Sequence, residues 1–202
     1  MRFIGDIHGE VFSYAPIIAG STESVQVGDF GVGFLDGMAQ EYADDLHKDG
    51  RHKFIRGNHD DPGLCKQRPG YIADGTYDER GIFYVGGAWS IDWHWRTAGY
   101  TWWPEEELSD EELVTMHDLY LEHRPRIMVT HDAPTDVAFE FFIKGSHKPQ
   151  HRTRTAEAFQ SMFAAYQPET WLFGHWHIDK DAVINGTRFI CLGINSYIDL
   201  KI

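Results

Sequence analysis

Five short stretches of this sequence place aspartate, asparagine or histidine at or just after a short apolar, β-branched run. They are residues 4–9, 27–30, 56–60, 129–132 and 173–177. Each polar set is expected at the carboxyl end of a strand, which is where open α/β sheets place their sites. Five such loops that converge predict a binuclear metal centre. The candidate ligands are Asp6, His8, Asp29, Asn58, His131, His175 and His177.

These ligands supply carboxylate, amide oxygen and imidazole groups, with no thiolate among them. Such donors suit Mn, Fe, Zn or Ni rather than Cu(I) or an iron–sulfur cluster. An anionic carboxylate is the best bridge between two cations because it neutralises both. Two ions about 3.5–4 Å apart convert an oxygen held between them into a hydroxide near neutral pH, aimed at a phosphorus atom. They also take up charge on the phosphoryl oxygens. The ligand set therefore favours phosphoester hydrolysis.

Glycine directly precedes four of the candidate ligands. The four glycines are Gly5, Gly28, Gly57 and Gly174. At these places the backbone is expected to turn sharply and to approach the metals without a Cβ atom in the way.

The elements that must position these residues follow from the hydrophobic pattern. Alternating strands and helices predict a predominantly parallel α/β sheet. The Asn185-Gly186 pair between two β-branched runs predicts a hairpin. Pro16 is expected to interrupt the first helix or to confine it to short turns. The expected strands cover residues 2–5, 24–27, 53–55, 81–85, 126–129, 169–173, 181–184 and 187–192, and the expected helices cover 11–19, 37–48, 109–122 and 156–166.

Two segments fit no regular period. Residues 88–108 hold five of the seven tryptophans, interleaved with His94 and Arg96. This segment either covers the edge of the sheet or forms a lid that presents Trp, His94 or Arg96 to a substrate. The connection 133–152 is followed by Arg154 and carries a basic cluster in its second half. The cluster, which comprises Lys144, Lys148, Arg152 and Arg154, is either a solvated loop or an electropositive rim that faces the substrate.

Composition narrows the class of protein. A chain of 202 residues fits one domain spanning 1–202, and its 31 acidic against 18 basic residues give a net charge of −13. This charge disfavours general nucleic-acid binding, whereas two bound divalent cations would reverse the field locally and keep a phosphate substrate plausible.

There is no apolar run of about 18 residues, so we expect no membrane span. We expect no signal peptide, because the first strand and motif begin at once, and we expect the two cysteines, Cys65 and Cys191, to be apolar fillers. We expect a cytoplasmic location.

The complete motif set resembles the calcineurin-like metallophosphoesterase superfamily. It consists of Gly-Asp-Ile-His-Gly, Gly-Asp, Gly-Asn-His-Asp, His131 and Gly-His-Trp-His, which follow one another in the order of that superfamily over residues 5–177. The resemblance implies an α/β fold, a four-layer α/β/β/α sandwich of two mixed β-sheets flanked by helices. It also implies a di-metal site at the strand ends.

Carried over residue by residue, the resemblance implies a role for each motif position. Asp6, His8 and His177 would bind the first metal, and Asn58, His131 and His175 the second. Asp29 would bridge the two metals. His59 matches the general acid that protonates the leaving oxygen, and Arg56 matches an arginine that protein-phosphatase-like members use to hold phosphate.

The sequence departs from the protein serine/threonine phosphatases after the second motif. Those enzymes continue with Asp-Arg, of which the acid orients the histidine and the arginine holds phosphate, whereas this chain continues with Phe30-Gly31. Asp60 is the neighbouring candidate for orienting His59. Arg152, Arg154 and Arg96 are candidates for the missing phosphate contact.

Other polar residues have less specific signals. Asp132 could orient a metal-binding histidine or cap a turn, and the sequence favours neither. Seven further histidines are expected to be mostly solvated, with His94 as the main exception. They are His47, His52, His94, His117, His123, His147 and His151.

We predict a phosphoesterase that hydrolyses phosphomonoesters through a hydroxide held by two divalent metal ions, with His59 as general acid. Mn is the first choice of metal, and Fe, Zn and Ni also suit the ligands. The substrate is a phosphorylated small molecule, nucleotide or phosphoprotein. The alternative enzyme is a phosphodiesterase for cyclic or dinucleotides. A catalytically silent scaffold is the non-enzyme alternative, disfavoured because His59 and all seven ligands are present.

Overall fold

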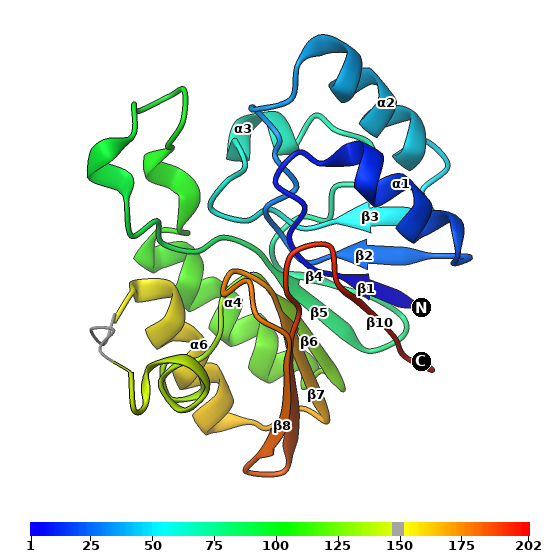
Figure 1. Cartoon of the computed structure of the whole chain (residues 1–202). Coiled ribbons are helices and arrows are strands. Elements are labelled where there is room, and N and C mark those ends of the chain that lie inside the picture. The colour runs from blue at the N-terminus through cyan, green and yellow to red at the C-terminus, as the bar shows by residue number, and fades with distance from the viewer. Residues whose placement is uncertain (147–151) are drawn as a thin grey trace.

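Two β-sheets pack face to face in this computed structural model, which describes residues 1–146 and 152–202 (Figure 1). The smaller sheet has the order β10-β1-β2-β3, and the larger has the order β4-β5-β6-β7-β9-β8. β10 joins the smaller sheet antiparallel, β4 and β8 join the two edges of the larger sheet antiparallel, and the other pairs are parallel, so both sheets are mixed. The strands are β1 (Arg2–Ile4), β2 (Ser24–Gln26), β3 (His52–Phe54), β4 (Thr76–Tyr77), β5 (Ile82–Val85), β6 (Ile127–Thr130), β7 (Thr170–Phe173), β8 (Lys180–Ile184), β9 (Thr187–Cys191) and β10 (Tyr197–Asp199).

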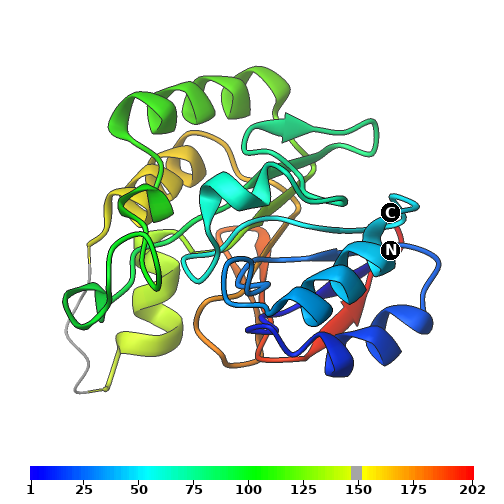
Figure 2. The same ribbon diagram turned by 90° about the horizontal axis from the view of Figure 1, so that it is seen from above.

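Helices cover the outer face of each sheet. α1 and α2 lie over the smaller sheet, and α4 and α6 lie over the larger one, as two perpendicular views show (Figures 1 and 2). The helical segments are α1 (Val11–Ala19), α2 (Gly37–His47), α3 (Pro62–Cys65), η1 (Trp93–Trp95), η2 (Pro104–Glu106), α4 (Asp110–His123), α5 (Thr135–Ala138), the π-helical η3 (Phe139–Ile143) and α6 (Arg154–Ala165). None of the helices in the described ranges combines the length and the apolar character needed to cross a membrane.

The period-two alternation of the strands explains the layers. In β5, Ile82 points into the core between the sheets, and Phe83 points to the core under α4 and α6. In β1, Phe3 faces the inter-sheet core and Ile4 faces α1. A strand with apolar residues on both faces is stable only when both faces are covered. The predicted four-layer α/β/β/α sandwich is confirmed.

Most predicted elements are confirmed, including the Ser109–Glu112 capping box of α4 and the hairpin at Asn185-Gly186, where both residues have positive φ. Both cysteines are free and buried, as expected. The sequence missed β10, and it also missed the short helices α5 and η3 within the connection 133–152. Lys148, part of the predicted basic cluster, lies in 147–151, outside the described residues.

Two local predictions were wrong. α1 continues past Pro16, because the carbonyl that the ring leaves unpaired belongs to Phe12 in the exposed first turn. His47 and His52 are buried at 2% and 6% exposure rather than solvated. His47 Nε2 lies 3.0 Å from the Tyr14 hydroxyl, and burial lowers the pKa of His47 to about 4.

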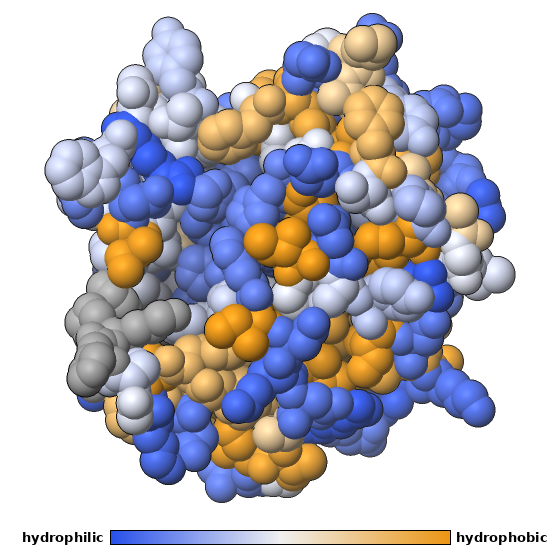
Figure 3. Space-filling model, viewed as in Figure 1, coloured by the Kyte–Doolittle hydropathy of each residue, from blue (hydrophilic) through white to orange (hydrophobic). Residues whose placement is uncertain are grey.

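The tryptophan-rich segment, residues 88–108, projects from the body of the protein (Figure 1). Its short 3-10 turn η1 and the Ala98–Trp102 bridge agree with the predicted loop that has only short structured pieces. Figure 3 shows the projection standing clear at the upper left, with hydrophilic side chains between it and the rest of that face. Trp103 is buried against Phe34, whereas Trp95 is 84% exposed. The segment is therefore packed against the body of the protein at Trp103, whereas the part around Trp95 lies in solvent.

The buried His47 predicts a loss of stability in mild acid. Its folded pKa of about 4 lies below the value of about 6.5 in an unfolded chain, so the unfolded state binds more protons between these values. Lowering the pH from 7 to 5 should therefore remove about 2 kcal/mol from the free energy of unfolding through this residue. His47→Phe should lose that part of the pH dependence in urea titrations, and His117→Phe should keep it. Equal pH slopes for parent and His47→Phe would contradict this assignment.

Candidate metal centre

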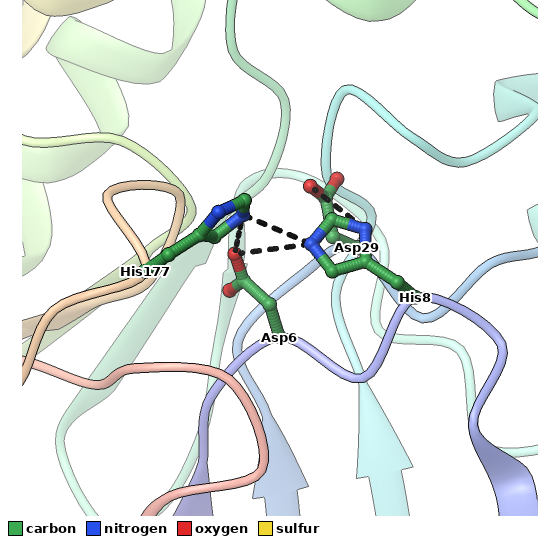
Figure 4. Close-up of side chains that lie close together, drawn as sticks. All are labelled: Asp6, His8, Asp29 and His177. Atoms are coloured by element: carbon green, nitrogen blue, oxygen red, sulfur yellow. Dashed lines mark hydrogen bonds and ion pairs between the residues drawn. The ribbon is translucent and has the colours of Figure 1, made fainter.

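The five motif stretches converge at one end of the two sheets, as predicted. Asp6 and His8 follow β1, Asp29 follows β2, and His177 follows β7 (Figure 4). Asp6 and Asp29 are almost fully buried at 0% and 1% exposure. Carboxylates so far from water need positive charge or hydrogen-bond donors nearby.

The first cluster consists of Asp6, His8, Asp29 and His177, whose ligand atoms all lie within 4.8 Å of one another. His177 Nε2 is 3.2 Å from Asp6 Oδ2 and 2.9 Å from His8 Nε2. Figure 4 shows both imidazole rings directed towards the Asp6 carboxylate. Nitrogen and oxygen lone pairs therefore converge on a common point.

The second cluster consists of Asn58, His131 and His175. Asn58 Oδ1 lies 3.0 Å from His131 Nε2 and 2.9 Å from His175 Nδ1. Asp29 connects the clusters, because its Oδ1 lies 3.2 Å from His131 Nε2 while its Oδ2 lies 3.8 Å from His8 Nδ1. One carboxylate oxygen thus faces each cluster, which is the geometry expected of a bridging ligand.

His131 is oriented from behind. Its Nδ1–H donates to the Val27 carbonyl at 2.9 Å, which directs Nε2 at Asn58 and Asp29. Burial alone would lower the pKa of His131, but the Asp29 and Asp6 carboxylates outweigh it and raise the pKa to about 10. Burial likewise opposes ionisation of Asp29, but His131 outweighs it and lowers the pKa of Asp29. The buried cluster therefore demands positive charge.

The backbone at this site is strained. Four of the seven predicted ligands, His8, Asp29, His175 and His177, have φ between 44° and 65°. Side chains other than glycine rarely adopt this region, at a cost on the order of 1 kcal/mol or more each. Strain concentrated on potential ligands is typical of a functional site rather than of a structural corner.

Glycine is required where two ligand loops come closest. A Cβ atom on Gly57 would collide with the Asp29 carboxylate, and one on Gly174 would collide with the Asp6 carboxylate. Glycine was predicted before these ligands so that the backbone could approach the site without a Cβ atom in the way.

His59 lies beside the clusters, with its ring 5.1 Å from that of His8. Arg96 Nη2 is 2.9 Å from His59 Nε2 and Nη1 is 3.2 Å from Nδ1, so the guanidinium donates to whichever ring nitrogen is unprotonated. Arg96 is itself held by Asp92 at 2.7 Å. Burial lowers the pKa of His59 to about 4, and Arg96 adds to this effect while Asp29 opposes it. The free site therefore holds His59 neutral.

Asp60 does not contact His59. Its carboxylate accepts hydrogen bonds from the backbone amides of Phe30, Gly31, Val32 and Gly57. Burial raises the pKa of Asp60 to about 7 and Asp29 adds to the rise, while these amide donors oppose it. The prediction that Asp60 orients the acid is replaced by a role in holding the loop after Asp29, because its oxygens are occupied there.

Arg56 is also placed differently from the expectation. It is 2% exposed, and its guanidinium donates to Asp74 and to the carbonyls of Glu105 and Glu106. It does not line the cavity at the metal centre. We therefore do not retain Arg56 as a phosphate contact, because its donors fasten the end of the tryptophan-rich segment.

The remaining predicted contacts have their own partners. Arg152 pairs with Glu157 at 3.8 Å and Arg154 with Glu107 at 3.5 Å. His94 stays on the projecting segment, where its ring contacts Trp93 and Trp95. None of these three lines the cavity, whereas Arg96 does.

Asp132 hydrogen-bonds the turn after His131, and its charge also acts on His175. Its Oδ1 accepts from the Ala133 amide at 2.7 Å and from the Trp176 indole N–H at 3.0 Å. The structure therefore favours the capping alternative and adds a contact to Trp176, a residue of the last motif.

A hydrogen-bonded chain missed by sequence reasoning orients Asn58. The Asn58 amide N–H donates to Ser90 Oγ at 3.0 Å, and the Ser90 hydroxyl donates to Glu106 at 2.6 Å. Glu106 also accepts from the Ser90 amide at 2.7 Å. All three residues are buried. This chain turns Asn58 Oδ1 towards the histidines and ties both ends of the tryptophan-rich segment to the second cluster.

The arrangement fits two divalent cations. All seven side chains present oxygen or imidazole nitrogen, and the buried acids and the raised pKa of His131 show that positive charge is favoured between them. A cavity of about 580 Å³ opens over the clusters, and Asp29, Asn58, His59, Arg96, His175 and His177 are among its lining residues.

Comparison with known proteins agrees with this geometry. A model of the calcineurin-like phosphoesterase family matches residues 2–179. No curated protein matches the sequence significantly.

Several solved structures share the fold. A putative 5′-nucleotidase from Staphylococcus aureus has a TM-score of 0.61 at 14% identity, covering 96% of this chain and 48% of its own. A Thermus thermophilus protein has a TM-score of 0.58 at 12% identity, with 96% and 90% covered. A dimetal phosphatase from Danio rerio has a TM-score of 0.54 at 13% identity, with 97% and 88% covered. At these identities the likeness shows the fold alone.

The chain through Ser90 predicts that Glu106 supports metal binding. Glu106→Ala should weaken the metal affinity of the cluster around Asn58 by about 10–100-fold, because the Ser90 hydroxyl loses its acceptor and the Asn58 amide is free to rotate. Chelator competition with Mn would measure this, with thermal unfolding of the metal-free proteins as a check on folding.

Glu105→Ala is the matched control, because Glu105 is adjacent, of the same type and exposed. Glu106→Gln, which keeps one acceptor, should lie between parent and Glu106→Ala. Equal Mn affinities for Glu106→Ala and Glu105→Ala would rule out the orienting role.

Proposed function

Because the chain belongs to the calcineurin-like phosphoesterase family, in which metal ions support phosphoester hydrolysis, we propose that it hydrolyses phosphomonoesters of small molecules. The observation that carries this proposal is the position of Arg96. It supplies a cation inside the cavity in addition to the metal clusters, beside the predicted acid His59.

The seven convergent side chains are the proposed ligands. Asp6, His8 and His177 would hold one ion, and Asn58, His131 and His175 would hold the other. Asp29 would be shared between them, which is supported by its two oxygens facing different clusters. Divalent ions bound there would lower the pKa of a water and neutralise phosphoryl oxygens. We propose Mn as the native metal, because mixed carboxylate, amide and imidazole donors suit it, with Fe, Zn or Ni as the other metals that suit them.

Arg96 favours a monoester over a diester. A phosphomonoester carries up to two negative charges on three non-bridging oxygens, whereas a diester carries one on two. A guanidinium fork matches phosphate oxygens and forms strong charge-assisted hydrogen bonds. Arg96 is held in place by Asp92, so its fork is positioned before the substrate arrives. It takes the place of the arginine that is absent after Asp29.

His59 is the proposed general acid. Arg96 donates to the imidazole in the free site, and an incoming phosphate dianion offers Arg96 a better acceptor. Once Arg96 turns to the phosphate, His59 is released and gains a negative neighbour that favours its protonated form. The proton then passes from the ring to the leaving oxygen.

The cavity supports a small substrate. A volume of about 580 Å³ is typical of pockets that enclose drug-sized molecules. Such a pocket can take up a whole phosphorylated metabolite, whereas a phosphoprotein would place only its phosphorylated side chain in it.

The test is hydrolysis by stripped protein reloaded with Mn, Zn, Fe, Ni or Mg, assayed on phenyl phosphate and diphenyl phosphate. We expect turnover with metal, none after stripping, and preference for the monoester. Arg96→Met should lower kcat/KM for the monoester by about 10–100-fold, the value of a hydrogen bond to a charged group, and should affect the diester less. Arg188→Met, which removes a surface arginine paired with Asp181, is the control. Diester preference that persists in Arg96→Met would favour the phosphodiesterase instead.

His59→Ala should keep the metal content and lower kcat by about 10²–10⁴-fold, the usual contribution of general acid catalysis. The loss should shrink for esters whose alcohols are strong acids, because these leave without protonation. Metal analysis and kcat across substituted phenyl phosphates would measure both, with His117→Ala as control. Full activity of His59→Ala on alkyl phosphates would sink the acid assignment.

A further inference from the structure

We propose that the leaving group of the natural substrate carries an aromatic ring and no negative charge, and that the ring binds against the apolar wall of the cavity. This inference rests on the proposed function, because it names what is attached to the phosphate that the metal centre receives. The wall is formed by Trp89, Ile91, Ala138, Ile143, Ala156 and Trp176.

The cavity is lined by two chemically different sets of residues. Asp29, Asn58, His175 and His177 belong to the metal clusters, whereas the residues of the wall are apolar. A phosphate seated at the metals uses only the polar set, and at about 580 Å³ the cavity is much larger than a phosphate. The remainder of the substrate must therefore lie against apolar surface, and burying apolar atoms there is favourable.

The wall is already assembled in the free protein. The Trp176 ring stacks on Phe142 at 4.5 Å with an angle of 11° between the planes, and its N–H donates to Asp132. Ile143 and Ala156 are 7% and 4% exposed, fixed by the packing of η3 and α6. A prebuilt wall that includes two indole rings suits a flat ring, because offset stacked and edge-to-face contacts are the favoured aromatic geometries.

The charges around the cavity disfavour an anionic leaving group. Among the described lining residues, Arg96 is the one arginine or lysine, and it lies at the reaction end beside His59. The neighbouring Lys144 and Arg154 pair with Glu140 and Glu107 and do not line the cavity. The lining acids Asp92 and Asp132 would repel a second anionic group.

An aromatic ring can come from two sources, an arylalkyl alcohol or a nucleoside. Both present a π-face, which is the feature the wall recognises. The test therefore includes 2-phenylethyl phosphate and adenosine 5′-monophosphate, with glycerol 1-phosphate as the substrate without a ring. All three release alkyl alcohols, so differences in leaving-group acidity contribute little.

With the Mn-loaded protein, we expect kcat/KM for at least one ring-bearing ester to exceed that for glycerol 1-phosphate by about 10-fold or more. Binding supplies a second measurement. By calorimetry, 2-phenylethylphosphonate, which cannot be hydrolysed, should bind more tightly than ethylphosphonate by a similar factor. Preference for adenosine 5′-monophosphate over 2-phenylethyl phosphate would identify the nucleoside source, and the reverse would identify the arylalkyl source.

Ile91→Asn tests the wall directly. Ile91 lines the cavity yet is 59% exposed, so the substitution should not disturb folding. It should lower the preference for the ring-bearing ester over glycerol 1-phosphate by about 3-fold or more, because part of the apolar surface is lost. Val114→Asn is the matched control, because Val114 is a 61% exposed apolar residue on α4 outside the cavity.

The outcomes separate this inference from the proposed function. Hydrolysis of all three esters without preference, or unaltered preference in Ile91→Asn, would overturn the aromatic wall and leave the phosphomonoesterase standing. Absence of hydrolysis with every metal would overturn the proposed phosphomonoesterase activity, and the binding of the two phosphonates would still test whether the wall binds an aromatic ring. Equal affinities of the two phosphonates would then overturn the aromatic-binding wall as well.

Discussion

The buried Asp29 carboxylate is the constraint on which the rest of the site depends. It lies at the end of β2 with 1% exposure, and each of its oxygens faces a different cluster of potential ligands. An anion in that position is tolerable only with compensating positive charge and hydrogen bonds. The His59 amide supplies one such bond at 2.7 Å, and His131 supplies charge in the free protein. Two cations satisfy the same demand more fully, which is why the geometry and the family assignment agree.

The fold creates this situation by directing parallel strands from both sheets to one edge. The strands β1, β2, β3 and β7 then turn through a residue with positive φ or a glycine without space for a Cβ atom, so that their polar side chains reach the common centre, whereas β6 presents His131 without either. The cost of these turns is met by the three apolar cores that hold the layers together. Residues remote from chemistry, such as Phe3 and Trp171, thus maintain the strain that positions the ligands.

The ligand set could be predicted because its signal is local. Each motif combines a strand end, a glycine and a polar residue within a few positions, and the order of the motifs adds specificity. The burial of His47 and the partners of Arg56, Asp60 and Glu106 could not be predicted, because each depends on residues far away in the chain. Arg56, for example, contacts Asp74 and Glu106. When a common residue type contacts a partner that is remote in the sequence, the residues next to it in the sequence give no sign of that contact. β10 was missed for the same reason, since a three-residue strand gains its identity only from pairing with β1.

The pairing of β10 with β1 also determines the order in which parts of the site form during synthesis and folding. β10 forms the edge of the sheet beside β1, and the first motif is hydrogen-bonded to the last part of the chain through Gly5 to Ser196 and Asn195 to Asp6. During synthesis the aspartate of the first motif is thus made almost two hundred residues before the segment that frames it. Contacts of such high sequence separation form late in folding. The edge of the site beside the first motif therefore reaches its final shape only once residues 195–199 have been made and have paired with the beginning of the chain.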